Sequence, residues 1–209
     1  MDTSLGRLLD HLEEQGIAEE TVILFASDNG SANPLGQPVL RDKKGSLHEG
    51  GVRVPIIASW AQPNSNHPLQ QRYPIQPESR HEGLVHLRDF FPTLLELAGA
   101  KPTAPDDGHS LLKTLAEPDI NHLPQQLGIH FPHGRKNWRA GTAWFSGEWK
   151  LIHRWATGES ELYHLWKDPG ETVNMIDQEP RVATRLQEEM TQWLEETDAQ
   201  TEVILKTEP

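Results

Sequence analysis

Two short apolar runs separated by a long polar segment constrain the fold of this chain more than any other feature. The runs are Val22–Ala26 (VILFA) and Val54–Ala58 (VPIIA), and both are rich in β-branched or aromatic residues. Such runs, bounded by polar and glycine-containing segments, are typical of buried strands rather than helices. The polar segment starts with SDNG (residues 27–30), directly after the first run. Because ligands bind at the carboxyl ends of strands in open α/β sheets, we expect these side chains to line a site.

The SDNG motif carries oxygen ligands. Asp28 and Asn29 place a carboxylate and an amide carbonyl side by side. Hard cations such as Ca²⁺ bind oxygens of this kind, and Ca²⁺ takes about 6–8 of them. Two residues cannot complete such a shell, so further ligands must come from elsewhere. Asp-Asn-Gly after a strand is also an ordinary turn, and SDNG alone favours that interpretation.

A second motif, KKGSLHEGGVRVP, covers residues 43–55. Lys44 precedes a glycine and can reach an anionic group as a compact point charge. The two glycines at positions 50 and 51 allow positive φ and close backbone approach. Glu49 and Arg53 are opposite charges at close spacing, which predicts an ion pair that braces the loop. Arg41 and His48 could either face a substrate or serve the loop itself.

The two motifs together resemble the type I sulfatases, arylsulfatase-like members of the alkaline-phosphatase-like superfamily. Their order and spacing outweigh the turn interpretation of SDNG. The resemblance implies that Asp28 and Asn29 are ligands of a divalent cation, usually Ca²⁺, with Mg²⁺ as the alternative. It also implies that Lys44 is catalytic and contacts the substrate's sulfate group. The family usually has Tyr where this chain has His48. The resemblance extends from Asp2 to about residue 194.

Sulfatases use a formylglycine nucleophile, made from Cys or Ser in a Cys/Ser-x-Pro-x-Arg context, which attacks sulfur. The chain has no cysteine and no such context. It also lacks the pair of aspartates that, by resemblance, supplies the other metal ligands. We therefore expect the chain to correspond to the C-terminal portion of a sulfatase only. The N-terminal half of the enzyme would be its missing partner, and the chain alone would be incomplete and inactive.

Composition narrows the class of partner. The net charge of −12 argues against nucleic acid, whose phosphates require a basic surface, but it does not exclude a small anionic substrate. No stretch approaches the ~18 apolar residues of a membrane span. The N-terminus lacks the pattern of a signal peptide, so the sequence leaves the compartment open.

The rest of the chain predicts an α/β fold in two parts. Residues 1–120 read as part of an alkaline-phosphatase-like mixed sheet with flanking helices, with a leucine-rich helix before the first strand and another, capped by Asp89, within residues 84–99. Residues 62–82 read as a long loop. Residues 121–209 predict a small antiparallel sheet packed by a C-terminal helix that starts at Pro180. Within this part ELYHLWKDPGETVNM (161–175) is similar to the C-terminal sheet of sulfatases.

A separate pair of imidazoles occurs in His130-Phe-Pro-His133. Pro132 opposes the helix that would align them on a metal. Many sulfatases carry a similar segment whose histidines approach the substrate, so the resemblance makes His130 and His133 substrate-binding. Structural or surface roles are the alternative. Three basic residues follow between positions 135 and 139, and they could bind a sulfated sugar or form a solvated loop.

The resemblance implies a sulfuric ester hydrolase that removes sulfate from a sulfated sugar or an aryl ester. A phosphodiesterase or phosphonate monoester hydrolase of the same superfamily is one alternative, because phosphate and sulfate are both tetrahedral anions. A non-catalytic truncated fragment, which at most binds metal weakly, is the other.

Overall fold

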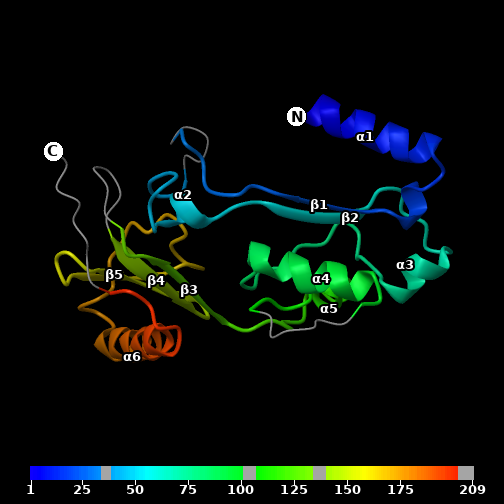
Figure 1. Cartoon of the computed structure of the whole chain (residues 1–209). Helices are drawn as coiled ribbons and strands as arrows, with labels where there is room; N and C mark the ends of the chain where they lie inside the picture. The colour runs from blue at the N-terminus through cyan, green and yellow to red at the C-terminus, as the bar shows by residue number, and fades with distance from the viewer. Residues whose placement is uncertain (34–38, 101–106, 134–139, 202–209) are drawn as a thin grey trace. The chain divides into compact units, whose positions relative to one another are not determined.

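The computed structural model describes residues 1–33, 39–100, 107–133 and 140–201. The chain forms two compact units, which we describe separately (Figure 1). The first combines Met1–Ser27 with Pro55–Leu123, and the second combines Asp28–Val54 with Pro124–Pro209. The predicted division into residues 1–120 and 121–209 stays a prediction. Both motifs that resemble sulfatases lie largely in the second unit.

Both predicted strands of the first unit are present. β1 (Val22–Ala26) and β2 (Ile56–Trp60) pair antiparallel, with Ala26 opposite Ile56. Residues 27–55 therefore form a single connection between β1 and β2, which starts and finishes at the same end of this strand pair. The strands are half-buried rather than buried as predicted, and Ile57 is 58% exposed, because the described part of this sheet has two strands only. The mixed sheet stays a prediction.

Helices make up much of the remaining first unit. α1 (Asp2–Glu14) follows the predicted leucine spacing and is followed by a 3₁₀ turn, Ala18–Glu20. The leucine stripe does not build a core, since no residue of α1 is buried and Leu8 is 48% exposed. α3 (Pro68–Arg72) interrupts the segment predicted as a loop, because Pro68 fits the first turn of a helix.

A 3₁₀ turn, Leu87–Asp89, leads into α4 (Phe90–Leu97), and α5 (Leu112–Ala116) follows along the chain. The predicted cap acts one turn earlier than expected. The buried carboxylate of Asp89 accepts a 2.7 Å hydrogen bond from the backbone N–H of His86 and so caps the 3₁₀ turn rather than α4. Among the described residues, no helix is both long and apolar enough to cross a membrane.

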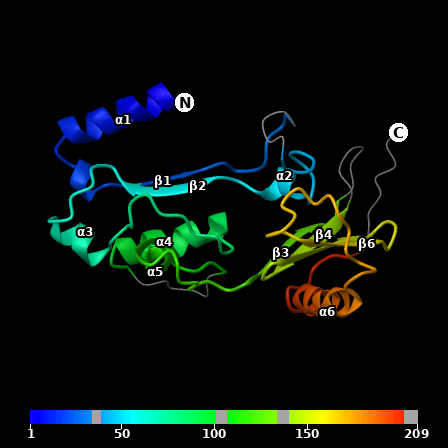
Figure 2. The same cartoon turned by 180° about the vertical axis from the view of Figure 1, so that it is seen from behind.

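The second unit contains the predicted meander. β3 (Gln126–Phe131), β4 (Gly141–Ser146), β5 (Trp149–Arg154) and β6 (Ser160–His164) form an antiparallel sheet in chain order. α6 (Pro180–Glu196) lies across one face of this sheet (Figure 2). The small antiparallel sheet with its C-terminal helix is therefore confirmed.

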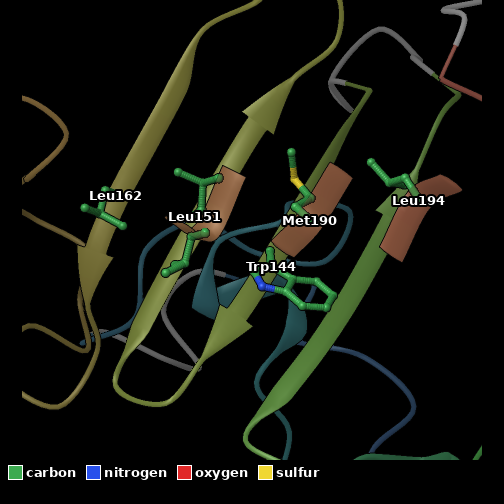
Figure 3. Close-up of a cluster of buried hydrophobic side chains, with 6 residues drawn as sticks. Trp144, Leu151, Leu162, Met190 and Leu194 are labelled. Carbon is green, nitrogen blue, oxygen red and sulfur yellow. The ribbon is translucent and has the colours of Figure 1, made fainter. Parts of the chain in front are cut away.

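The core of the second unit lies between the sheet and α6. Figure 3 shows Trp144, Leu151 and Leu162 on the strands with Met190 and Leu194 on the helix, and Leu186 completes the cluster. Since successive strand residues point to opposite faces, the neighbours of these strand residues face away from α6. On that opposite face Lys150 is paired with Tyr163 across β5 and β6, and both are buried.

Candidate functional site

Backbone hydrogen bonds join the two motifs. The N–H of Gly30 donates to the carbonyl of Gly51 at 3.0 Å, and the N–H of Lys44 donates to the carbonyl of Ser31 at 2.9 Å. Asp28 and Asn29 are therefore on the same compact segment as Lys44, although sixteen positions separate Asp28 from it in the sequence. The sequence predicted neighbouring roles for these residues, and the structure brings their backbones together.

Glycines make this close approach feasible. A Cβ atom built on Gly30 would overlap the backbone carbonyl of Gly50, and one on Gly51 would overlap the carbonyl of Ser46. Gly50 itself is the second residue of a short helix, α2 (Glu49–Val52), and its N–H donates to the carbonyl of residue 41 at 2.8 Å. The predicted close backbone approach is thus the role of these glycines. Positive φ in this region occurs instead at Gly45, at 91°, and at Asp42, at 63°.

The side chains predicted to do chemistry are exposed or partly exposed. Asp28 and Lys44 are exposed and Asn29 is half-buried. Neither Asp28 nor Lys44 forms an ion pair with another described residue, so no described side chain neutralises either charge. The carboxylate and amide oxygens suit a hard cation, but they are two of the ~6–8 that Ca²⁺ requires. No group of three or more His, Cys, Asp or Glu side chains within the described ranges could hold a metal. The predicted roles of Asp28, Asn29 and Lys44 stay predictions.

A polar network lies beside Lys44 and is internal. The His48 side chain is 4% exposed, and its Nδ1 lies 2.7 Å from Asp42 Oδ2 and 3.1 Å from Ser46 Oγ. Its Nε2 lies 3.3 Å from Glu161 Oε2, on β6. Burial alone would raise the pKa of Asp42, but hydrogen bonds with Ser46 and His48 hold it below its usual value. His48 therefore serves the loop rather than facing a substrate.

Arg41 joins the same network. Its Nη1 donates to the Tyr163 hydroxyl at 2.7 Å, and that hydroxyl donates to Glu161 Oε1 at 3.1 Å. The contact with His48 is the largest cause that holds the pKa of Glu161 at about 2. Burial and the Glu161 carboxylate raise the pKa of Tyr163 to about 12. Near neutral pH the Glu161 carboxylate is therefore ionised and the Tyr163 hydroxyl is protonated. The two groups stabilise the segment around Arg41 and do not exchange protons.

A buried charge cluster on the same sheet face was not predicted. Lys150 Nζ lies 2.9 Å from Glu49 Oε1 and 2.8 Å from Glu171 Oε1, and all three side chains are buried. The predicted pair of Glu49 and Arg53 is confirmed, with 3.4 Å between Oε2 and Nη1. The sequence offered one signal, a lysine inside the apolar strand WKLIHR, but it gave no indication of partners 101 and 21 positions away.

The two imidazoles lie in the second unit and differ in environment. On β3, His130 Nδ1 lies 2.7 Å from Thr142 Oγ1, and its Nε2 lies 2.8 Å from the carbonyl of Gln200. His133 is exposed, and its ring contacts that of Phe131. Both ring nitrogens of His130 thus have partners within the fold, whereas His133 is accessible. Substrate binding by either stays a prediction. The basic residues at 135, 136 and 139 lie outside the described ranges.

Comparisons with known proteins point to one class. A family model described as Sulfatase matches residues 1–100. A sulfatase of Formosa agariphila is 31% identical over 245 aligned positions, which cover 99% of this chain and 40% of that protein. A multifunctional protein of the alkaline phosphatase superfamily from Trinickia caryophylli is 36% identical over 131 positions, covering 63% of this chain and 23% of that protein.

The fold agrees with these matches. A structure solved in complex with its substrate D-glucosamine-2-N,6-O-disulfate superimposes with a TM-score of 0.71 at 22% identity, covering 91% of this chain and 37% of the other. The fold of the chain is thus similar to that of this structure. In sequence, the chain matches the sulfatase family, whose members are sulfuric ester hydrolases. The chain spans less than half the length of each of these proteins.

Proposed function

We propose that this chain forms part of an enzyme that hydrolyses sulfate esters, with the nucleophile supplied by residues outside the 209 of this sequence. In this proposal Asp28 and Asn29 bind a divalent cation, Ca²⁺ or alternatively Mg²⁺, and Lys44 binds the sulfate group. The observation that carries the proposal is the joining of the two motifs by the hydrogen bonds from Gly30 and Lys44. It presents a carboxylate and an ammonium on one segment, and neither is neutralised by an ion pair with another described residue.

The charges suit a sulfate ester. A hydrogen bond from a lysine ammonium to an anionic oxygen contributes about 1.5–3 kcal/mol, which corresponds to roughly ten- to a hundredfold in rate if it forms in the transition state. A cation held by Asp28 and Asn29 would supply further positive charge next to the ester. The Glu161 carboxylate of β6 contacts His48 within the internal network.

A sulfated sugar or aryl ester is the substrate class that we propose. The structural relative described above was solved with a sulfated glucosamine, and we extend that class to this chain. His133 is the histidine best placed to contact such a substrate, because its ring is exposed while both nitrogens of His130 have partners.

A second function is favoured by one observation. The multifunctional relative from Trinickia caryophylli shows that the alignable region also occurs outside proteins named as sulfatases. A phosphodiesterase or phosphonate monoester hydrolase would use the same ammonium and cation on a phosphorus oxyanion. We place it second, because the family model that matches residues 1–100 is that of sulfatases.

The test compares the rates of hydrolysis of three esters by the full-length protein, with Ca²⁺ in excess. 4-Nitrophenyl sulfate, bis(4-nitrophenyl) phosphate and 4-nitrophenyl phenylphosphonate share a leaving group, so their kcat/KM values report the preferred oxyanion. We expect the sulfate ester to be the best substrate. A higher kcat/KM on either phosphorus ester would favour the second function, and no hydrolysis of any ester would favour a non-catalytic protein.

A further inference from the structure

We propose that Lys150 is a positioning residue, whose buried ammonium holds the segment that carries Lys44 against the C-terminal sheet. The importance of this role for catalysis rests on the function proposed above, whereas the mechanical role does not. The carboxylates of Glu49 and Glu171 are the groups through which Lys150 acts.

Lys150 is the second residue of β5 and lies on the face opposite α6. Its side chain is fully buried, and its Nζ contacts one oxygen of Glu49 and one of Glu171 at 2.9 and 2.8 Å. The ammonium also lies 4.9 Å from the centre of the Phe145 ring. A buried charge is retained only when it is paired, and here a single ammonium pairs two carboxylates that would otherwise repel each other.

The carboxylate of Glu171 contacts both Lys150 and the start of α2. Glu171 Oε2 accepts a hydrogen bond from the backbone N–H of Glu49 at 2.7 Å, which satisfies a donor at the start of this helix. Arg53 contacts the other oxygen of Glu49 at 3.4 Å, so two cations balance two carboxylates. The turn that contains Glu171 is thereby attached both to α2 and to β5.

Backbone contacts pass this constraint on to Lys44. Next to Glu49, the N–H of Gly50 donates to the carbonyl of Arg41, and the N–H of Ser46 donates to the carbonyl of Lys43. Residues 41–50 are thus tied together across their ends, with Lys44 between them. A shift of Glu49 must move residues 41–50. Through the hydrogen bond from the N–H of Lys44 to the carbonyl of Ser31, it must also move the SDNG loop.

The position of the cluster argues for this role over a general contribution to stability. The sheet already has an apolar core on its other face, where Leu151 packs with residues of α6. Apolar residues in place of a buried ion cluster are often as stable or more so, so stability alone does not require the charges. The charges occur on the face that contacts residues 41–53, and they contact that segment at Glu49.

Hydrogen exchange measured by mass spectrometry on the 209-residue chain tests the mechanical role. Lys150→Met removes the ammonium and keeps an unbranched apolar stem, and Met190→Ala is the matched control on the α6 face. We expect Lys150→Met to raise exchange in peptides from residues 40–54 by tenfold or more while α6 stays protected. Met190→Ala should show the opposite pattern. Equal loss of protection in both regions, or no change at 40–54, would overturn the proposal.

A second variant covers the case in which Lys150→Met fails to fold. Glu171→Gln keeps the size of the side chain and leaves Lys150 paired with Glu49. It should increase exchange in the same peptides by a smaller factor. Full protection at residues 40–54 in this variant would contradict a positioning role.

A double-mutant cycle in the gene-encoded protein then links position to catalysis. If Lys150 acts through Lys44, Lys150→Met should lower kcat/KM for 4-nitrophenyl sulfate about tenfold in the wild-type background and less than twofold in the Lys44→Ala background. Equal factors in both backgrounds would show a purely structural role and refute the link. Faster exchange at 40–54 without any sulfatase activity would refute the proposed function and leave the mechanical role standing.

Discussion

Gly30→Ala is the substitution whose effect follows most directly from the structure. The Cβ that it adds would overlap the carbonyl oxygen of Gly50, and it would also come within 2.9 Å of the carbonyl carbon of Gly51. Both obstacles are backbone atoms in a segment held by hydrogen bonds, so no side chain can rotate away. The SDNG loop must therefore separate from α2 to accommodate the added methyl group.

The cost combines two effects. Overpacking of a tight site costs about 1–3 kcal/mol. Separation also breaks the 3.0 Å hydrogen bond from Gly30 to Gly51, which contributes about 0.5–1.5 kcal/mol. We expect a loss of about 1.5–4.5 kcal/mol, which is a large share of the ~5–15 kcal/mol that stabilises an ordinary domain.

Urea unfolding, followed by tryptophan fluorescence and circular dichroism, measures this loss. Gly6→Ala is the control, since its Cβ meets no atom within 4 Å and the residue lies inside α1. Alanine should stabilise that helix by about 0.5–1 kcal/mol, so the same chemical change should have opposite signs at the two sites. An unchanged unfolding midpoint for Gly30→Ala would refute the close approach of the two motifs.

Three further predictions concern the remaining charges and the core. The pKa of Glu161 is lowered from 4.5 to about 2, so the ionised carboxylate stabilises the fold above pH ~4.5, and this stabilisation is lost as the pH falls toward 2. Allowing for solvent screening, the free energy of unfolding of Glu161→Gln should therefore fall by about 1–2 kcal/mol less than that of the wild type between pH 6 and 3, as measured by urea unfolding. Leu151→Ala should lower the free energy of unfolding by about 2–5 kcal/mol, because Leu151 is fully buried. Leu8→Ala, at a side chain that is 48% exposed, should change the free energy of unfolding by less than ~0.5 kcal/mol. Equal effects of the two substitutions would contradict the core assignment. Millimolar Ca²⁺ should barely shift the melting temperature of the 209-residue chain, because Asp28 and its neighbour supply only part of a shell; a shift of several degrees would show that the site is more complete than the described residues indicate.

The C-terminal sheet was the part of the fold most predictable from sequence. Its strands are short, separated by glycine-containing turns and joined in chain order, so local patterns were sufficient to place each one beside the next. The C-terminal helix was predictable for the same reason, because Leu186, Met190 and Leu194 recur at helical spacing, and all three are buried. Here local preference and tertiary packing agree.

Periodicity was less reliable in the first unit. The first helix was predicted from its leucines, yet Leu8 is 48% exposed, and Phe91 on the predicted helix α4 is 60% exposed. A periodic pattern shows that a helix can bury one side, but it does not identify what covers that side. The family resemblance predicted a mixed sheet, whereas the described strands of this unit form an antiparallel pair.

The site was predictable in its motifs but not in its supports. SDNG and the EGG segment are local patterns, and their glycines indicated close backbone approach. The groups that fix them come from elsewhere in the chain, since His48 contacts Glu161 and Glu49 contacts Lys150. Pairs of charges separated by a hundred positions leave no periodic trace in a single sequence. Such contacts became visible only with the fold.

The central claim is that Lys44 binds the sulfate group of an ester that this protein hydrolyses. The measurement that tests it most directly is kcat/KM for 4-nitrophenyl sulfate, with Ca²⁺ in excess, for the gene-encoded protein and two alanine variants. Lys43 and Lys44 are adjacent, exposed lysines, so Lys43→Ala is a matched control for charge and solubility. We predict a tenfold or greater loss for Lys44→Ala and a change of less than twofold for Lys43→Ala. Equal rates for the wild type and Lys44→Ala would contradict the claim.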